Sequence, residues 1–185
     1  MSNHEVILSS RTSTNMIVRR ARLDDAKAIG TIHVHSWQVA YQGIVPSAFL
    51  ESLSIEQREG VWRQNLERGA SETWVAEEGG QVRGWVSVAR SRDSDALSTI
   101  GEVWAIYVDP SYWRRGVGQR LWREAEEQLG AAGFSEVTLW VLKENAQAIA
   151  FYESNGLAVD PGSQKPITAG DAQLLEIRLR KRLGG

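Results

Sequence analysis

The stretch YWRRGVGQRLW, from Tyr112 to Trp122, decides how this sequence is interpreted. Two glycines, Gly116 and Gly118, stand where an amphipathic pattern begins. Apolar residues then recur every four positions, at Val117, Leu121, Ala125 and Leu129. This spacing predicts a helix over Gly116–Ala132. The glycines therefore lie at the N-terminus of a helix, where backbone N–H groups have no partner inside the helix.

Those free N–H groups and the helix dipole favour a bound anion. A glycine has no Cβ to keep a phosphate away from the main chain, and Arg114, Arg115 and Arg120 add positive charge. The stretch is typical either of a pyrophosphate site or of an ordinary strand-to-helix turn with solvated arginines. Short glycine motifs do not separate the two.

Two other phosphate motifs are excluded. The Walker pattern requires a lysine followed by serine or threonine after its second glycine, and none follows here. The dinucleotide pattern G-x-G-x-x-G has Leu121 in place of its third glycine, and it also belongs after an early strand.

Composition limits the class of protein. The chain has 185 residues, a formal net charge of −2 and no cysteine. We therefore expect one domain over residues 16–185 behind a flexible tail over 1–15, a cytoplasmic location, and no disulfide, thiolate metal site or cysteine nucleophile. The balanced charge gives no argument for nucleic acid or an anionic membrane as a partner. No run of about 18 apolar residues predicts a membrane span.

The remaining pattern predicts alternating strands and helices. Strands are expected at 16–21, on both sides of Gly79-Gly80, at 102–109, at 136–142 and at 173–181. Helices are expected from Asp24 to about Ala40, at 47–53, at 55–68 and at 145–156, the last with Asn145 as its N-cap. This order implies a mixed α/β, or α+β-like, domain. The polar segment 160–171 is interpreted as a mobile loop, and the final strand as an exposed edge that could pair in a homodimer.

Two blocks carry a family resemblance. The segments IYVDPSYWRRGVGQRLW and LWVLKENAQAIAFYESNGL resemble the GNAT superfamily of acyl-CoA-dependent N-acetyltransferases. Its phosphate loop has the pattern Q/R-x-x-G-x-G/A, and its second signature is an Asn seven residues before a Tyr, here Asn145 and Tyr152. The blocks span Glu102–Leu157. One position departs from the pattern, because Trp113 stands where Gln or Arg is usual.

The resemblance implies a single GNAT-type domain. Its central sheet would have six to seven mostly antiparallel strands, splayed at the middle and flanked by helices. Acetyl-CoA would enter the opening as co-substrate, with no metal. The residues implied in its binding are Ile106, Tyr107, Val108, Arg114, Arg115, Gly116, Val117, Gly118, Gln119, Asn145 and Tyr152. The activity implied is acetyl transfer directly to a primary amine, of a small molecule or a protein N-terminus. A CoA-binding regulatory module without turnover, or use of a longer acyl-CoA, stays open.

Two residues are assigned to proton transfer. Tyr152 is the candidate acid, because its O–H can donate a strong hydrogen bond to a departing thiolate. The alternative is an ordinary core tyrosine. Glu102 is the candidate base, because strand alternation places it on the same face as Trp104 and Ile106, where aromatic neighbours can raise a carboxyl pKa. The alternative is a solvated glutamate at the end of a strand.

The acceptor amine is expected to lie among aromatic side chains. Trp37 and Tyr41 share a face of the first helix, and with Trp104 they form the candidate substrate-binding set. An aromatic core stripe explains the same spacing. His33 and His35 are two residues apart, so they diverge on a helix and do not predict a metal site.

Overall fold

The computed structural model describes residues 15–184, so nearly all of the expected tail over 1–15 lies outside the described residues. Its strands are β1 Ile17–Arg20, β2 Glu72–Glu78, β3 Gln81–Arg90, β4 Ile100–Val108, β5 Glu136–Leu142, β6 Ala158–Ala169 and β7 Ala172–Arg182. Its helices are α1 Ala26–Ala40, α2 Ser47–Glu51, α3 Ile55–Arg68, α4 Val117–Ala131 and α5 Ala146–Ser154. The mixed α/β fold expected from the sequence is confirmed.

The strands form one seven-stranded sheet in the order β1-β2-β3-β4-β5-β7-β6. Every neighbouring pair is antiparallel except β4 and β5, which run parallel. These two pair only over Ile100–Glu102 and Glu136–Thr138. Beyond that point β5 continues to pair with β7, while β4 continues to pair with β3. The sheet is therefore splayed at its middle, and the second half of β4 has one unpaired edge.

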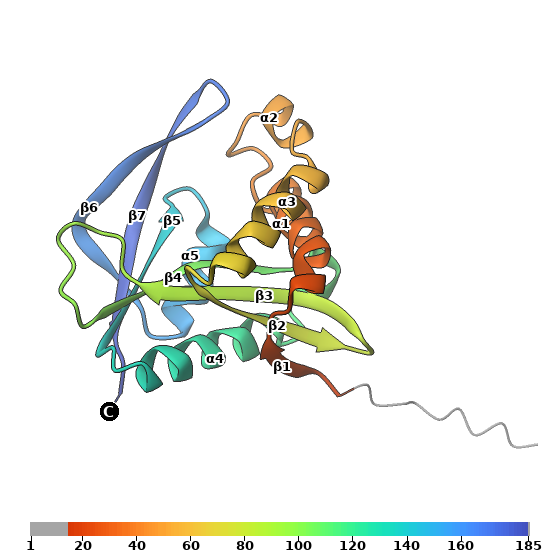
Figure 1. Ribbon diagram of the computed structural model, residues 1–185. Helices are drawn as coiled ribbons and strands as arrows, with labels where there is room; N and C mark the ends of the chain where they lie inside the picture. The colour runs from red at the N-terminus through yellow and green to blue at the C-terminus, as the bar shows by residue number, and fades with distance from the viewer. Residues whose placement is uncertain (1–14, 185) are drawn as a thin grey trace, which may run out of the picture.

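Helices cover both faces of the sheet, as Figure 1 shows. Helix α4 packs on one face with its apolar stripe fully buried, at Val117, Leu121, Trp122, Ala125 and Leu129. Burying one such side chain contributes about 1.5–3 kcal/mol. Helices α1 and α3 pack on the other face around Trp62 and Trp85. The tip of the β6–β7 hairpin reaches α2, where Leu50 and Ala169 share a third, smaller core.

A β-bulge changes which side chains of β4 share a face. Ser87 pairs with Ala105, but Val88 pairs with Val103, so Trp104 is one extra residue on β4. Such an insertion interrupts the alternation of a strand. Val103 packs in the same cluster as Ile106, on the α4 face. The expectation that Glu102 shares a face with Ile106 is therefore wrong.

The C-terminal hairpin also differs from the expectation. Segment 160–171, interpreted as a loop, belongs mostly to β6, which holds Pro166 and Gly162 beside a register shift between Val159 and Gln164. Glycine and proline obscure a strand pattern, and an edge strand with a bulge tolerates both. Strand β7 is not an edge, because β5 and β6 flank it. The pairing argument for a homodimer through residues 173–181 is thereby removed.

Candidate functional site

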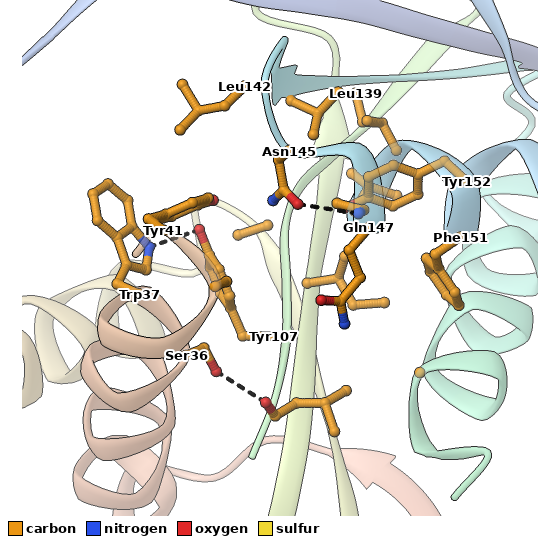
Figure 2. Close-up of a pocket in the computed structure, with 18 of the residues that line it drawn as sticks. Ser36, Trp37, Tyr41, Tyr107, Leu139, Leu142, Asn145, Gln147, Phe151 and Tyr152 are labelled. Atoms are coloured by element: carbon orange, nitrogen blue, oxygen red, sulfur yellow. Dashed lines mark hydrogen bonds between the residues drawn. The ribbon is translucent and has the colours of Figure 1, made fainter. Parts of the chain in front are cut away.

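A cavity of about 540 Å³ lies where β4 and β5 diverge (Figure 2). Side chains from α1, β4, the loop before α4, β5, α5 and β7 line it. Most of the residues expected from the sequence meet here: Trp37, Tyr41, Trp104, Ile106, Tyr107, Val108, Arg114, Gly116, Gly118, Gln119, Asn145 and Tyr152. Three expected residues, Glu102, Arg115 and Val117, are not among those that line it.

The loop before α4 presents a helix N-terminus to this cavity. Gly116 is the N-cap of α4 and has φ 81°, a left-handed conformation that glycine adopts without steric cost. Arg114 also has a positive φ, 59°, which is unusual for a residue with a side chain. Left-handed residues turn successive N–H groups toward one side and form a concave anion site. Backbone and side chain of Arg114 therefore both favour a phosphate here.

The other members of the loop have structural contacts. Val117, the first residue of α4, is buried in the core between α4 and the sheet. The guanidinium of Arg115 lies over the ring of Tyr112, with its carbon 5.0 Å from the ring centre. Gln119 Nε2 donates to Oδ1 of Asn155, 2.6 Å away, which joins the first turn of α4 to the end of α5. These contacts fix the loop against its neighbours.

Trp113 occupies the position where the loop pattern departs from Gln or Arg. Its indole Nε1–H donates a hydrogen bond to the carbonyl oxygen of Val108 at 2.8 Å. The hydroxyl of Ser36 donates to the same oxygen at 2.9 Å. The loop, the last residue of β4 and helix α1 therefore meet at one carbonyl group.

Asn145 combines a capping contact with a free amide. Its Oδ1 accepts from the backbone N–H of Ala148 at 3.1 Å, which caps α5. In Figure 2 its Nδ2 points away from α5, toward the side of the cavity that holds Tyr41. The residue is only 8% exposed. Its amide nitrogen can donate to a carbonyl group of a ligand that lies in the cavity.

Tyr152 lies on α5, one and two turns beyond Ala148 and Asn145, and packs against Trp122 with ring centres 5.9 Å apart. Burial raises the pKa of its phenol above the ordinary value of 10.0, and the charge of Tyr107 adds to this. A raised pKa keeps the hydroxyl protonated at neutral pH. Tyr152 can therefore donate a proton or a hydrogen bond into the cavity, but it cannot act there as a base.

Two of the three aromatic side chains expected to hold an acceptor, Trp37 and Tyr41, form one wall with Tyr107. The third, Trp104, contacts Arg92. Trp37 Nε1 donates to the hydroxyl of Tyr107 at 2.8 Å, and its ring meets Tyr41 edge-on, with centres 4.9 Å apart (Figure 2). Burial raises the pKa of both tyrosines. His33 stacks on the ring of Tyr107 behind this wall, and its Nδ1 accepts from Trp62. Burial and the nearby Arg58 lower the pKa of His33 to about 3, so it is neutral.

Glu102 is engaged elsewhere. It is 1% exposed, and its carboxylate forms an ion pair with the guanidinium of Arg92. The backbone N–H of Arg92 also donates to Oε2 of Glu102, at 2.9 Å. Both carboxylate oxygens are therefore held by the start of the β3–β4 loop. The assignment of Glu102 as the base stays a prediction.

Among the lining residues for which the sequence predicted no site role are Trp140 on β5 and Glu176 on β7. Both were expected only as members of a strand. Arg114 and Glu176 are the only charged side chains among the residues described as lining the cavity. The loop before α4 therefore contributes a basic side chain to the cavity, and β7 contributes an acidic one.

Within residues 15–184, no three or more His, Cys, Asp or Glu side chains are grouped so that they could hold a metal ion. In the same part of the chain, no helix has both the length and the apolar character that crossing a bilayer requires.

A family model and a curated relative that match this chain both carry the name acetyltransferase. A family described as "Acetyltransferase (GNAT) family" matches residues 33–157. The uncharacterized N-acetyltransferase YuaI of Bacillus subtilis is 36% identical over 138 residues, which are 74% of this chain and 77% of that protein.

Solved structures share the fold. The PaiA N-acetyltransferase of Thermoplasma acidophilum, in complex with coenzyme A, matches with a TM-score of 0.70 at 20% identity, over 91% of this chain and 99% of that one. YncA of Salmonella typhimurium, solved with its cofactor acetyl-CoA, matches with a TM-score of 0.69 at 22% identity, over 92% of this chain and 95% of that one.

Proposed function

Because this chain belongs to the GNAT family of acetyltransferases, we propose that it transfers an acetyl group from acetyl-CoA directly to a primary amine. The amine belongs to a small molecule or to a protein N-terminus. One observation carries the proposal: the unpaired edge of β4, the N-terminus of α4, Asn145 and Tyr152 all border the same cavity.

The residues present fit a coenzyme A group. Within Ile106–Val108, the backbone groups that face away from β3 offer hydrogen bonds to an extended, amide-bearing arm, as an added strand would receive them. The carbonyl oxygen of Val108 is not one of them, because it already accepts from Trp113 and Ser36. The loop from Arg114 to Gln119 offers N–H groups and positive charge to a pyrophosphate. The Nδ2 of Asn145 supplies a further donor. Acetyl-CoA would supply the acetyl group as a thioester.

The proposed roles in the reaction follow from geometry and pKa. The attacking amine must lose a proton, since an alkyl ammonium with a pKa near 10.4 is not a nucleophile. The departing sulfur must gain a proton or a hydrogen bond, and Tyr152 is the group that supplies it. Its raised pKa keeps the hydroxyl protonated, so that it can donate a hydrogen bond to the sulfur. No covalent intermediate on the protein is required.

Titration calorimetry with acetyl-CoA tests the proposal, using wild type and Gly118→Trp. A Cβ on Gly118 would lie 3.4 Å from the ring of Phe151, so a tryptophan there fills the cavity end of the loop. We expect micromolar binding in the wild type and none in the variant. Gly130→Trp, an exposed change near the far end of α4 with open space around it, is the control. No binding to the wild type at millimolar acetyl-CoA would remove the proposal.

An amine panel then separates the enzyme from its alternatives. Acetylation of any amine supports the transferase, whereas binding without turnover supports a regulatory module. Faster turnover with propionyl-CoA or succinyl-CoA would identify a longer acyl donor. In the same assay, Glu102→Gln tests the base assignment. If Glu102 is the base, the variant has a lower kcat, and its kcat no longer shows the fall at low pH that protonation of the base causes in the wild type. A variant that keeps this fall would show that Glu102 only pairs with Arg92.

A further inference from the structure

The ammonium group of Lys165 lies between an aromatic ring and a carboxylate at the edge of the cavity. Its Nζ is 3.9 Å from the ring centre of Trp140 and 3.6 Å from Oε2 of Glu176. Trp140 and Glu176 line the cavity, whereas Lys165 is not among the lining residues. An aromatic face and a carboxylate together form a binding place for an organic cation. In this structure the chain's own lysine occupies that place.

The ring of Trp140 is held in position from its other edge. Its Nε1–H donates to both carboxylate oxygens of Asp93, at 3.0 and 3.1 Å. Arg178 in turn donates to Asp93 at 3.1 Å and pairs with Asp160 on β6. These contacts connect β5, β6, β7 and the β3–β4 loop. The aromatic face is therefore preorganised, and a ligand does not have to order it.

The contact between Lys165 and Glu176 can be exchanged for a ligand. Their side chains are 42% and 21% exposed, and water and salt weaken ion pairs of this kind. Glu176 is also the only acidic side chain among those described as lining the cavity, and Arg114 is the only basic one. A cationic group would therefore be drawn to Glu176 and an anionic group to Arg114.

From this geometry we propose that Trp140 and Glu176 form an ammonium subsite and that the acceptor is a small linear diamine. One amine reacts beside Tyr152, and the other, as an ammonium, displaces Lys165 from the ring of Trp140 and from Glu176. The inference rests on the proposed acetyl transfer and names its substrate class. Lys165 then competes with the substrate for Trp140 and Glu176. A diamine has a second ammonium group that can displace Lys165, whereas a simple alkylamine has none.

Paired acceptors of equal length test the subsite. The measured quantity is kcat/KM for α,ω-diaminobutane divided by kcat/KM for butylamine, both with acetyl-CoA. Glu176→Gln is expected to lower this ratio about tenfold, the size of one lost charge-assisted contact. Lys165→Met keeps an unbranched side chain as far as Cε, removes the competing ammonium, and is expected to raise the ratio roughly threefold, as the loss of an exposed ion pair allows. Glu127→Gln makes the same chemical change on the exposed face of α4 and is the control.

Opposite shifts in the two variants support the subsite. An unchanged ratio in Glu176→Gln overturns it, and so does an equal loss for both amines, which would place Glu176 at the reacting amine. A wild type that acetylates both amines equally well also overturns it while the transferase proposal stands. Calorimetric titration with diaminobutane gives a readout without turnover: weaker binding to Glu176→Gln than to wild type is expected even if acetyl-CoA does not bind.

Discussion

Trp113 and Ser36 donate hydrogen bonds to the same carbonyl oxygen, that of Val108, from the loop before α4 and from helix α1. Each bond is of ordinary length, and the oxygen has two lone pairs to accept them. Both the loop before α4 and helix α1 are therefore bonded to the last residue of β4, which fixes their positions relative to each other.

This shared acceptor predicts non-additive mutations. Trp113→Phe and Ser36→Ala each leave Val108 with one donor, so each should lower the free energy of unfolding by only about 1 kcal/mol. The double variant leaves a half-buried carbonyl without a donor and should lose more than the sum. Urea unfolding of the four proteins measures the coupling. A strictly additive double variant would show that the two bonds act independently.

Asn145 predicts a separation of stability from binding. Asn145→Ala removes the cap of α5 and should lower the free energy of unfolding by about 1 kcal/mol, together with acetyl-CoA affinity. Asn145→Asp keeps an oxygen acceptor for the N–H of Ala148 but has no amide donor for the cavity. It should therefore unfold like the wild type and bind acetyl-CoA about tenfold more weakly. Equal affinities in Asn145→Asp and wild type would assign Asn145 to capping alone.

Tyr152→Phe removes the proposed acid and should lower kcat about a hundredfold. Tyr112→Phe removes a hydroxyl from the loop end of the same cavity and should lower kcat far less. Because burial raises the pKa of Tyr152 above 10.0, the wild-type kcat should show no loss from its ionisation below that pH. Pre-steady-state rates across pH measure this. A Tyr152→Phe enzyme with kcat within twofold of wild type would mean that another group protonates the sulfur.

His33 predicts acid sensitivity of the fold. Its pKa is 6.5 when unfolded and about 3 when folded, lowered first by burial and then by Arg58. Between these values the unfolded chain binds the proton and the folded chain does not, so the free energy of unfolding falls as pH falls from 6.5 toward 3. Its contribution is complete above pH 6.5 and is of the order of a few kcal/mol.

Urea unfolding of wild type and His33→Gln at several pH values checks this. Glutamine keeps an oxygen acceptor for the indole N–H of Trp62 but does not titrate. The variant should therefore have a shallower loss of stability between pH 6.5 and 4 than the wild type. Parallel curves would place the acid sensitivity in carboxylates instead.

The sequence predicted the parts of the site that lie within one segment. The loop from Arg114 to Gln119 and the spacing of Asn145 from Tyr152 depend on local backbone geometry. Such geometry can be predicted from the residue types of a single segment. Glu102 was placed on the wrong face because a single inserted residue, Trp104, interrupts the alternation of β4. The residue types around Trp104 do not predict a β-bulge.

The far end of the cavity could not be predicted for a different reason. Trp140 and Glu176 belong to different strands, and they face one cavity only because β4 leaves β5 while β7 stays beside it. Strand order is a property of the whole chain. The hairpin partner β6 was missed as well, since its glycine and proline resemble those of a loop.

The open edge of β4 has a consequence for the lifetime of the protein. Beyond Glu102 no strand pairs with the β5 side of β4, and an open strand edge of this kind can recruit other chains. A ligand at a hundred times its dissociation constant adds about 2.7 kcal/mol to the free energy of unfolding. Resistance to proteolysis and to aggregation would then rise with the occupancy of the cavity, by acetyl-CoA if the proposed function holds.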